Sequence, residues 1–124
     1  MSYSIMEIRG DTMDTQILQN MTVELKRGTQ IIVVLQALKK DQYGYSLLQD
    51  LEKSGVQMEA GTLYPLLRRL ESQGLLESNW DTTETRPRKY YKLNKDGQNI
   101  LKEMIQIWYQ IVNDMDTILT EDKQ

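Results

Sequence analysis

Apolar side chains recur at helical spacing along most of this chain. Segment 25–39 contains an unbroken apolar run over residues 31–35. The β-branched residues in that run would suit a buried strand, but the length of the segment and its polar flanks favour a buried helix. A second, amphipathic helix is predicted over residues 45–53, with Gly55 at its end. Residues 41–44, between the two helices, are expected to form a turn.

A third helix is predicted from about Glu59 to Gly74, and its two faces differ. One side of a helical wheel carries four leucines, which are Leu63, Leu66, Leu67 and Leu70. The opposite side is low in bulk and basic, with Gly61, Pro65, Arg68 and Ser72. Pro65 removes one backbone hydrogen bond, which is tolerated near a helix start or makes the first turn irregular. The low, basic side is suited to the DNA major groove, which admits one α-helix.

A β-hairpin is predicted directly after this helix. Its strands cover residues 75–81 and 87–93, and three aromatic side chains supply cross-strand packing: Trp80, Tyr90 and Tyr91. The order of the elements predicts a winged helix-turn-helix, a mainly α fold with a small β-hairpin, in which the hairpin would grip the DNA backbone. The alternative is an ordinary α+β domain whose basic side chains are only solvated.

The last predicted helix starts at Asn94, which is a good N-cap, and runs to about Leu119. Its apolar residues alternate at spacings of three and four, as at the a and d positions of a coiled coil. A small three-helix domain cannot cover such a wide apolar face, so a homodimer across a two-fold axis is expected. Packing within its own chain is the alternative. The candidate dimerisation residues are Leu101, Ile105, Trp108, Ile111, Val112, Met115, Ile118 and Leu119.

The chain divides into three predicted parts. Residues 1–22 form an N-terminal extension, residues 23–93 the winged helix-turn-helix, and residues 94–124 the dimerisation helix. Within the extension, a short helix from about Asp11 to Asn20 and a disordered arm are both compatible with the sequence.

Composition narrows the chemistry. The chain has no cysteine and no histidine, so disulfides are excluded, and nucleophilic triads and most zinc sites lose their usual ligands. We therefore expect no metal, no cofactor and no enzymatic activity. Without a membrane-spanning run or a signal-peptide pattern, a cytoplasmic protein is expected.

The net charge of −3 argues against a generic polyanion binder. The charges are unevenly distributed, however. Residues 61–93 carry six Arg or Lys against four acids, whereas residues 94–124 carry three Lys against six acids. Positive charge is therefore concentrated in the predicted helix and hairpin. We expect DNA binding that depends on sequence and weakens steeply with salt.

Several short motifs resemble those of the PadR family of bacterial transcription regulators. They are Arg27-Gly28, Tyr43-Gly44-Tyr45, Gly61-Thr62-Leu63-Tyr64-Pro65, Arg68-Arg69-Leu70-Glu71, Gly74-Leu75, Trp80, Arg88-Lys89-Tyr90-Tyr91 and Gly97. The resemblance covers residues 25–119, in the family's order. Asn94 departs from it, because the family usually has Thr there. The resemblance implies a repressor, with an apolar chamber between subunits that stacks planar aromatic compounds.

These patterns assign candidate roles. Thr62, Tyr64 and Arg68 would lie in the groove, and Lys26 and Arg27 would contact phosphate. Arg69 would contact phosphate or pair with a nearby acid. Arg86, Arg88 and Lys89 would hold the hairpin to the backbone or minor groove. The effector chamber would be formed by Trp108, Met104, Ile111 and Met115, although a plain dimer core explains the same residues.

The predicted function is a homodimeric, ligand-responsive DNA-binding regulator that reads an inverted-repeat operator. The alternative is a winged-helix dimer that acts as a protein-interaction module without binding DNA.

Overall fold

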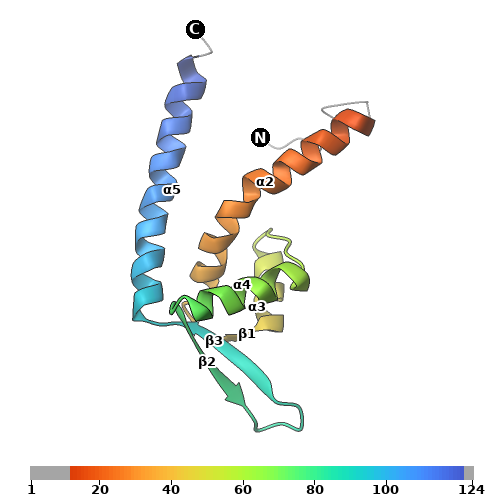
Figure 1. Cartoon of the computed structure of the whole chain (residues 1–124), viewed down its shortest axis with the longest axis vertical. Coiled ribbons are helices and arrows are strands. Elements are labelled where there is room, and N and C mark those ends of the chain that lie inside the picture. Colours follow the sequence, from red (N-terminus) through yellow and green to blue (C-terminus); the bar gives the residue numbers. More distant parts are fainter. Residues whose placement is uncertain (1–11, 122–124) are drawn as a thin grey trace. The chain divides into compact units, whose positions relative to one another are not determined.

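The computed structural model describes residues 12–121. It divides into two compact units, one ending at Ile31 and the other beginning at Ile32. The second unit has the element order β1, α3, α4, β2, β3 and α5, preceded by the end of α2 (Figure 1).

Helix α2 spans Thr12–Ala37 and passes through the unit boundary. The predicted buried helix over residues 25–39 is confirmed as a helix, but it does not begin at Leu25. The segment before it is also helical, with no break, so Lys26 and Arg27 lie in the middle of α2 instead of at a helix start. The predicted N-terminal extension is helical from Thr12, and residues 1–11 lie outside the described part.

Helices α3 (Gly44–Lys53) and α4 (Ala60–Ser72) end in the same way. After α3, Gly55 has a φ of 85°, and the N–H of Val56 donates to the carbonyl of Leu51 at 2.8 Å. After α4, Gly74 has a φ of 81°, and Leu75 N–H donates to the carbonyl of Leu70 at 3.0 Å. Glycine adopts this left-handed conformation without steric cost, which explains both endings.

The start of α4 differs in detail from the prediction. Glu59 occupies the N-cap position, but its side chain makes no capping hydrogen bond. Instead, its backbone carbonyl accepts hydrogen bonds from the N–H groups of Thr62 and Leu63 at 2.9 Å. Pro65 lies inside α4 without ending it.

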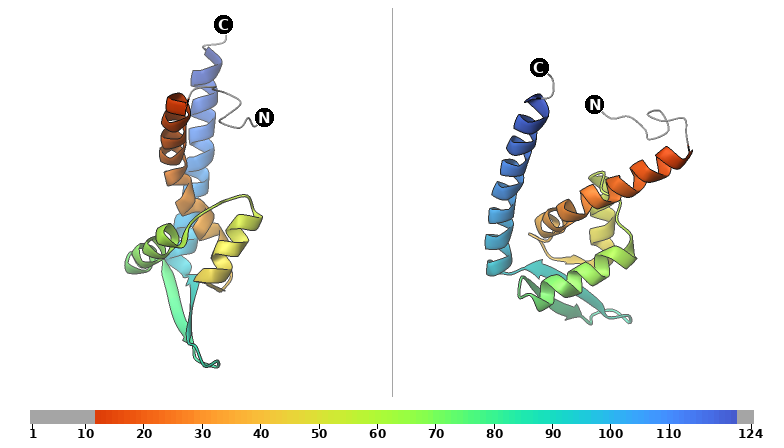
Figure 2. Two further views of the ribbon diagram at one scale, coloured as in Figure 1. Left: turned by 90° about the vertical axis from the view of Figure 1, so that its right-hand side faces the viewer. Right: turned by 45° about the horizontal axis from the view of Figure 1, so that its top comes forward.

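The sheet has three strands, one more than predicted. β1 (Gln42–Tyr43), β2 (Leu76–Asp81) and β3 (Arg88–Leu93) form an antiparallel sheet in the order β1-β3-β2. The predicted turn at residues 41–44 was therefore wrong, because Gln42 and Tyr43 pair with Tyr91 and Tyr90. The hairpin of β2 and β3 extends beyond helices α3 and α4 of the same unit (Figure 2).

The core of the second unit consists mostly of leucines from every helix and from the sheet. Its most buried side chains are Val34, Leu35, Leu38, Leu47, Leu51, Leu63, Leu67, Leu70, Leu93 and Leu101. Helix α5 (Lys95–Glu121) enters this core only through its first turns. Its start is fixed by Asn94, whose side-chain oxygen accepts a hydrogen bond from Gly97 N–H at 2.7 Å, which confirms the predicted N-cap.

None of the helices in residues 12–121 combines the length and apolar content that a bilayer crossing needs. Acidic side chains in the same part of the chain do not gather into a group that could bind a metal ion.

Candidate nucleic-acid interface

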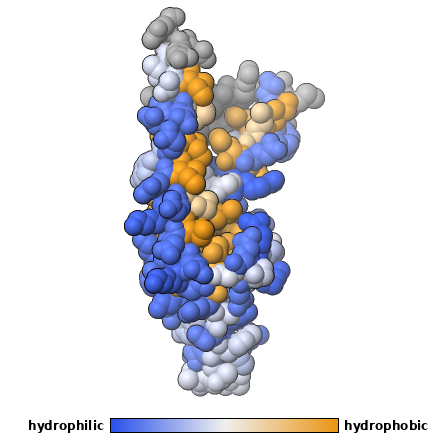
Figure 3. Space-filling view, turned by 60° about the vertical axis from the view of Figure 1, so that its left-hand side comes forward, coloured by the Kyte–Doolittle hydropathy of each residue, from blue (hydrophilic) through white to orange (hydrophobic). Residues whose placement is uncertain are grey.

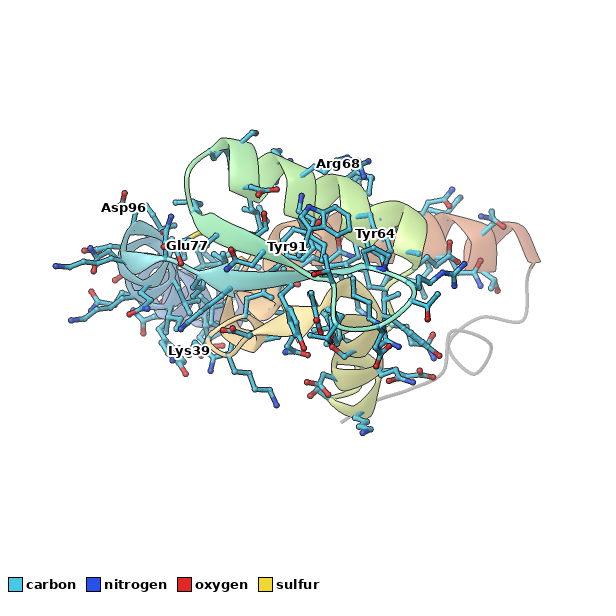
Figure 4. The ribbon with its side chains drawn as sticks, turned by 90° about the horizontal axis from the view of Figure 1, so that it is seen from below. Lys39, Tyr64, Arg68, Glu77, Tyr91 and Asp96 are labelled. Atoms are coloured by element: carbon cyan, nitrogen blue, oxygen red, sulfur yellow. The ribbon has the colours of Figure 1, made fainter. Side chains whose placement is uncertain are left out.

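Helix α4 presents a continuous exposed face opposite its buried leucines. Leu63, Leu67 and Leu70 are buried and set the rotation of the helix. The side chains that consequently point outward are Thr62, Pro65, Arg68, Arg69 and Ser72. Among the described residues, neither arginine has an acidic partner within ion-pair distance. Two free guanidinium groups therefore project from α4, and Figure 4 labels that of Arg68.

Tyr64 is half-buried and lies against the start of α3. A Cβ atom added to Gly44 would meet its ring, with the hydroxyl oxygen only 2.8 Å away. Because Gly44 has no side chain, the ring fits there and fixes the spacing of α3 and α4. The part of Tyr64 that stays exposed is thus held in place by the scaffold.

The hairpin presents its basic side chains on two faces. Successive residues of a strand point to opposite sides, so Arg88 and Tyr90 share one face and Lys89 and Tyr91 the other. A guanidinium nitrogen of Arg88 lies 3.2 Å from Glu84, and its central carbon lies 5.0 Å from the centre of the Tyr43 ring. The Arg88 side chain is still 51% exposed.

The Arg88 guanidinium lies over the Tyr43 ring, which belongs to a cluster of aromatic and polar side chains. The rings of Tyr43 and Tyr90 stack with centroids 3.9 Å apart, and the Tyr43 hydroxyl donates to Asp81 at 2.8 Å. Hydrogen bonding with Tyr90, followed by burial and Asp81, raises the pKa of Tyr43. The pKa of Asp81 is lowered, chiefly because the hydroxyl and N–H of Thr83 donate to it at 2.7 Å and 3.0 Å. These contacts therefore join the two strands near the loop end of the hairpin, where Asp81 and Arg88 are the last paired residues.

Lys89 connects the hairpin to α4. Its ammonium nitrogen lies 3.2 Å from Glu71 Oε1, and Glu71 also accepts a short hydrogen bond from the Ser78 hydroxyl. The Ser78 bond and then Lys89 lower the pKa of Glu71, and Glu71 in turn raises the pKa of Lys89. Lys89 is thus engaged within the domain, unlike Arg86, which lies exposed in the loop between the strands.

Three elements meet at a surface cavity of about 610 Å³. Its lining comprises Tyr45, Ser46, Gln49, Tyr64, Arg86 and Arg88. Tyr64, Arg86 and Arg88 were predicted from separate segments. Tyr45 and Gln49 were missed, although the polar side of α3, where they lie one turn apart, was a signal for them. Lys26 and Arg27 are exposed on α2 and belong to the other unit, which ends at Ile31.

A second exposed surface of the same unit is the apolar face of α5, away from the wing. Leu101 is buried in its own domain, and Met104, Ile105 and Val112 are half-buried. Figure 3 shows a hydrophobic band along this helix. Its exposed members include five of the predicted residues, Trp108, Ile111, Met115, Ile118 and Leu119.

Comparison with known proteins identifies this combination of elements. Residues 31–103 match the family model of the transcriptional regulator PadR-like family. This chain belongs to the PadR-like family. A PadR family regulator from Eggerthella lenta is 43% identical, and its crystal structure aligns with a TM-score of 0.81 over 84% of this chain and 93% of that one. One from Clostridium difficile is 32% identical, with a TM-score of 0.65 over 72% and 96% of the two chains.

A transcriptional regulator of Mycobacterium tuberculosis is 32% identical over 78 residues, which are 63% of this chain and 73% of that protein. The predicted family and fold class are therefore confirmed, and this PadR-like protein is a DNA-binding transcription regulator with a winged helix-turn-helix and a long C-terminal helix. In that fold α4 is the recognition helix and the β2–β3 hairpin is the wing.

Proposed function

We propose that this PadR-like regulator binds an inverted-repeat operator as a homodimer and represses transcription until a small planar aromatic molecule releases it. The observation that carries the DNA-binding part is the position of Arg68 on α4, without an acidic partner among residues 12–121 and on the same domain as the exposed Arg86 and Arg88 of the wing. Binding to the chromosome would place the protein in the cytoplasm.

The individual side chains suggest distinct roles at the operator. Arg68 would donate two hydrogen bonds to a guanine edge, while Thr62 and Tyr64 contact the neighbouring thymine methyl or phosphate. Arg69, Arg86 and Arg88 would bind phosphate, which positions the domain without reading bases. Lys89 would act mainly through Glu71, by fixing the wing to α4. Lys26 and Arg27 remain candidate phosphate contacts on α2.

The exposed band of α5 supports the homodimer. Ile111 and Met115 are 47% and 46% exposed, and Ile118 is more exposed still. Contiguous apolar surface of this kind marks an interaction site, and the a/d spacing suits a second copy of the same helix. Two recognition helices related by a dyad would then meet two half-sites of an inverted repeat.

The effector part of the proposal concerns Trp108, with Met104, Ile111 and Met115 as adaptable walls. A planar molecule between two α5 helices would switch off DNA binding if it prefers the subunit arrangement that does not fit the operator. Quenching of tryptophan emission by planar aromatic compounds tests this. Trp80 also fluoresces, so Trp108→Phe must lose the response, and an unaltered response would remove Trp108 from the site.

Fluorescence anisotropy with DNA from upstream of the protein's own gene tests operator binding. We expect Arg68→Ala to weaken binding by about tenfold or more, because a bidentate guanine contact contributes about 1–3 kcal/mol. The double change Arg86→Ala with Arg88→Ala should lower the slope of log affinity against log salt by about 1.8, since each phosphate contact contributes about 0.9.

Lys102→Ala is the matched control, because it removes one positive charge from the exposed surface of α5. It should leave the affinity and the salt slope unchanged. If the wild-type protein binds no fragment of this DNA at low salt, the DNA-binding proposal is wrong and a protein-interaction module replaces it.

A further inference from the structure

Trp80 is the large apolar side chain that is exposed on the described strands of the hairpin, whose leucines are buried. It is 63% exposed, although its position near the end of β2 was predicted to use it for cross-strand packing. The other two aromatic residues of the hairpin are covered to a greater extent, since Tyr90 stacks on Tyr43 and Tyr91 is buried. Packing within the domain therefore does not account for Trp80.

Trp80 lies on the α4 side of the wing. Its cross-strand partner is Lys89, and Ser78 is two residues before it, so all three side chains share one face of the sheet. Both Lys89 and Ser78 contact Glu71 of α4. The hairpin diverges from α4 towards its tip (Figure 1), so Trp80 follows directly after the last contact between the wing and the recognition helix.

Trp80 and Arg68 both follow closely on the contact between β2 and α4 at Glu71, one on each element. β2 follows α4 after the turn at Gly74 and diverges from it (Figure 1), and Ser78 of β2 contacts Glu71 of α4. Two strand residues advance by about 6.6 Å, which is close to the pitch of one helical turn. Trp80 is therefore the next residue on this face of β2 after the contact with Glu71, and Arg68 lies on the turn of α4 that precedes Glu71.

The indole ring contacts Lys89, but its N–H group remains available for a hydrogen bond. The Lys89 ammonium nitrogen lies 6.0 Å from the centre of the ring, and Lys89 is itself anchored by Glu71. In the described part of the chain, no acceptor is within hydrogen-bond distance of the indole N–H. The wing thus presents an apolar ring face and a free donor together, next to a positive charge.

We propose that Trp80 is a DNA-contact residue of the wing, whose ring packs on a deoxyribose of the backbone beside the base pair read by Arg68. Bases inside a duplex are stacked on each other, so the apolar surface open to an indole is the edge of a sugar. The N–H would donate to the adjacent phosphate, as amphipathic side chains at wet interfaces usually do. This inference rests on the proposed operator binding.

A contact made by an uncharged side chain can be recognised from the dependence of DNA affinity on salt concentration. Trp80→Ala should weaken operator binding by about tenfold, which corresponds to about 1.4 kcal/mol, but it should leave the salt slope unchanged because no charge is lost. Trp80→Phe, which keeps a ring without the N–H, should recover part of the affinity. A reduced salt slope for Trp80→Ala, or an unchanged affinity, would overturn the proposal.

A second measurement keeps Trp80 intact. The chain has two tryptophans, so protein labelled with 5-fluorotryptophan gives two ¹⁹F resonances, and Trp80→Phe identifies that of Trp80. On addition of operator DNA, the Trp80 resonance should shift and lose most of its H₂O/D₂O isotope shift as the ring leaves water. If anisotropy shows operator binding while this resonance stays solvent-exposed, the Trp80 inference fails and the proposed function stands. If anisotropy shows no binding, both fail.

Discussion

At the scale of single residues, Gly44 illustrates how a missing side chain sets the distance between two helices. Gly44→Ala would push a methyl group into the Tyr64 ring, and such overpacking costs about 1–3 kcal/mol. Gly61→Ala is the control, since a Cβ there meets nothing within 4 Å. It should be neutral or stabilise by up to about 1 kcal/mol through helix propensity. Urea unfolding measures both.

The same pair of residues offers an internal check. With Tyr64→Ala in the background, Gly44→Ala should lose most of its cost, because the group that it displaces is gone. Equal costs of Gly44→Ala in the two backgrounds would show that the ring does not set this spacing.

The lowered pKa of Glu71 predicts that the folded protein becomes less stable in acid. Its pKa is lowered in the folded protein by Ser78 and Lys89, so its stabilising contribution is complete above the ordinary carboxyl pKa. That contribution is lost as the pH falls through the lowered, folded-state value. We expect Glu71→Gln to reduce the free energy of unfolding by up to about 1 kcal/mol at neutral pH, since the pair is partly exposed. The variant should also be less sensitive to acid, as denaturant titrations between pH 7 and pH 3 would measure.

Glu77→Gln provides the comparison, because Glu77 is exposed on the opposite face of the same strand. It should keep the acid-dependent loss of the wild type. An identical pH profile for Glu71→Gln and the wild type would mean that the Glu71 cluster does not stabilise the wing.

At the scale of elements, α5 depends on its N-cap. Asn94 accepts from Gly97 N–H at 2.7 Å and donates to the Gly74 carbonyl at 2.6 Å, which joins the start of α5 to the end of α4. We expect Asn94→Ala to lower the midpoint of urea unfolding by an amount equivalent to about 1 kcal/mol. Asn99→Ala, on the exposed surface of the same helix, should be neutral or slightly stabilising because alanine has the higher helix propensity.

At the scale of the whole molecule, the apolar band of α5 predicts the assembly state. Ile111→Glu should dissociate the dimer in sedimentation experiments, because it places a charge in the middle of the proposed seam. Asn113→Glu adds the same charge at an exposed position outside the predicted stripe and should leave the dimer intact. A folded Ile111→Glu dimer of wild-type affinity would contradict the packing argument.

Much of this protein was predictable from local sequence signals. The leucine faces of α3 and α4, the glycines after them and the Asn94 cap act over a few residues, and the helices end where these signals place them. The family and the winged helix-turn-helix followed from the motifs and from the order of elements. The exposed arginine face of α4 followed from helical periodicity alone.

Tertiary structure decided the features that join distant segments. Gln42 and Tyr43 are too few to show strand periodicity, and they become a strand only because β3 offers a free edge to pair with. Lys89 was grouped with the other wing cations, but its partner Glu71 lies 18 positions earlier and is brought close by folding. The exposure of Trp80 was equally hidden, because burial depends on which side chains lie across the sheet. Local periodicity determines which face of an element is apolar, and only the folded chain determines what that face meets.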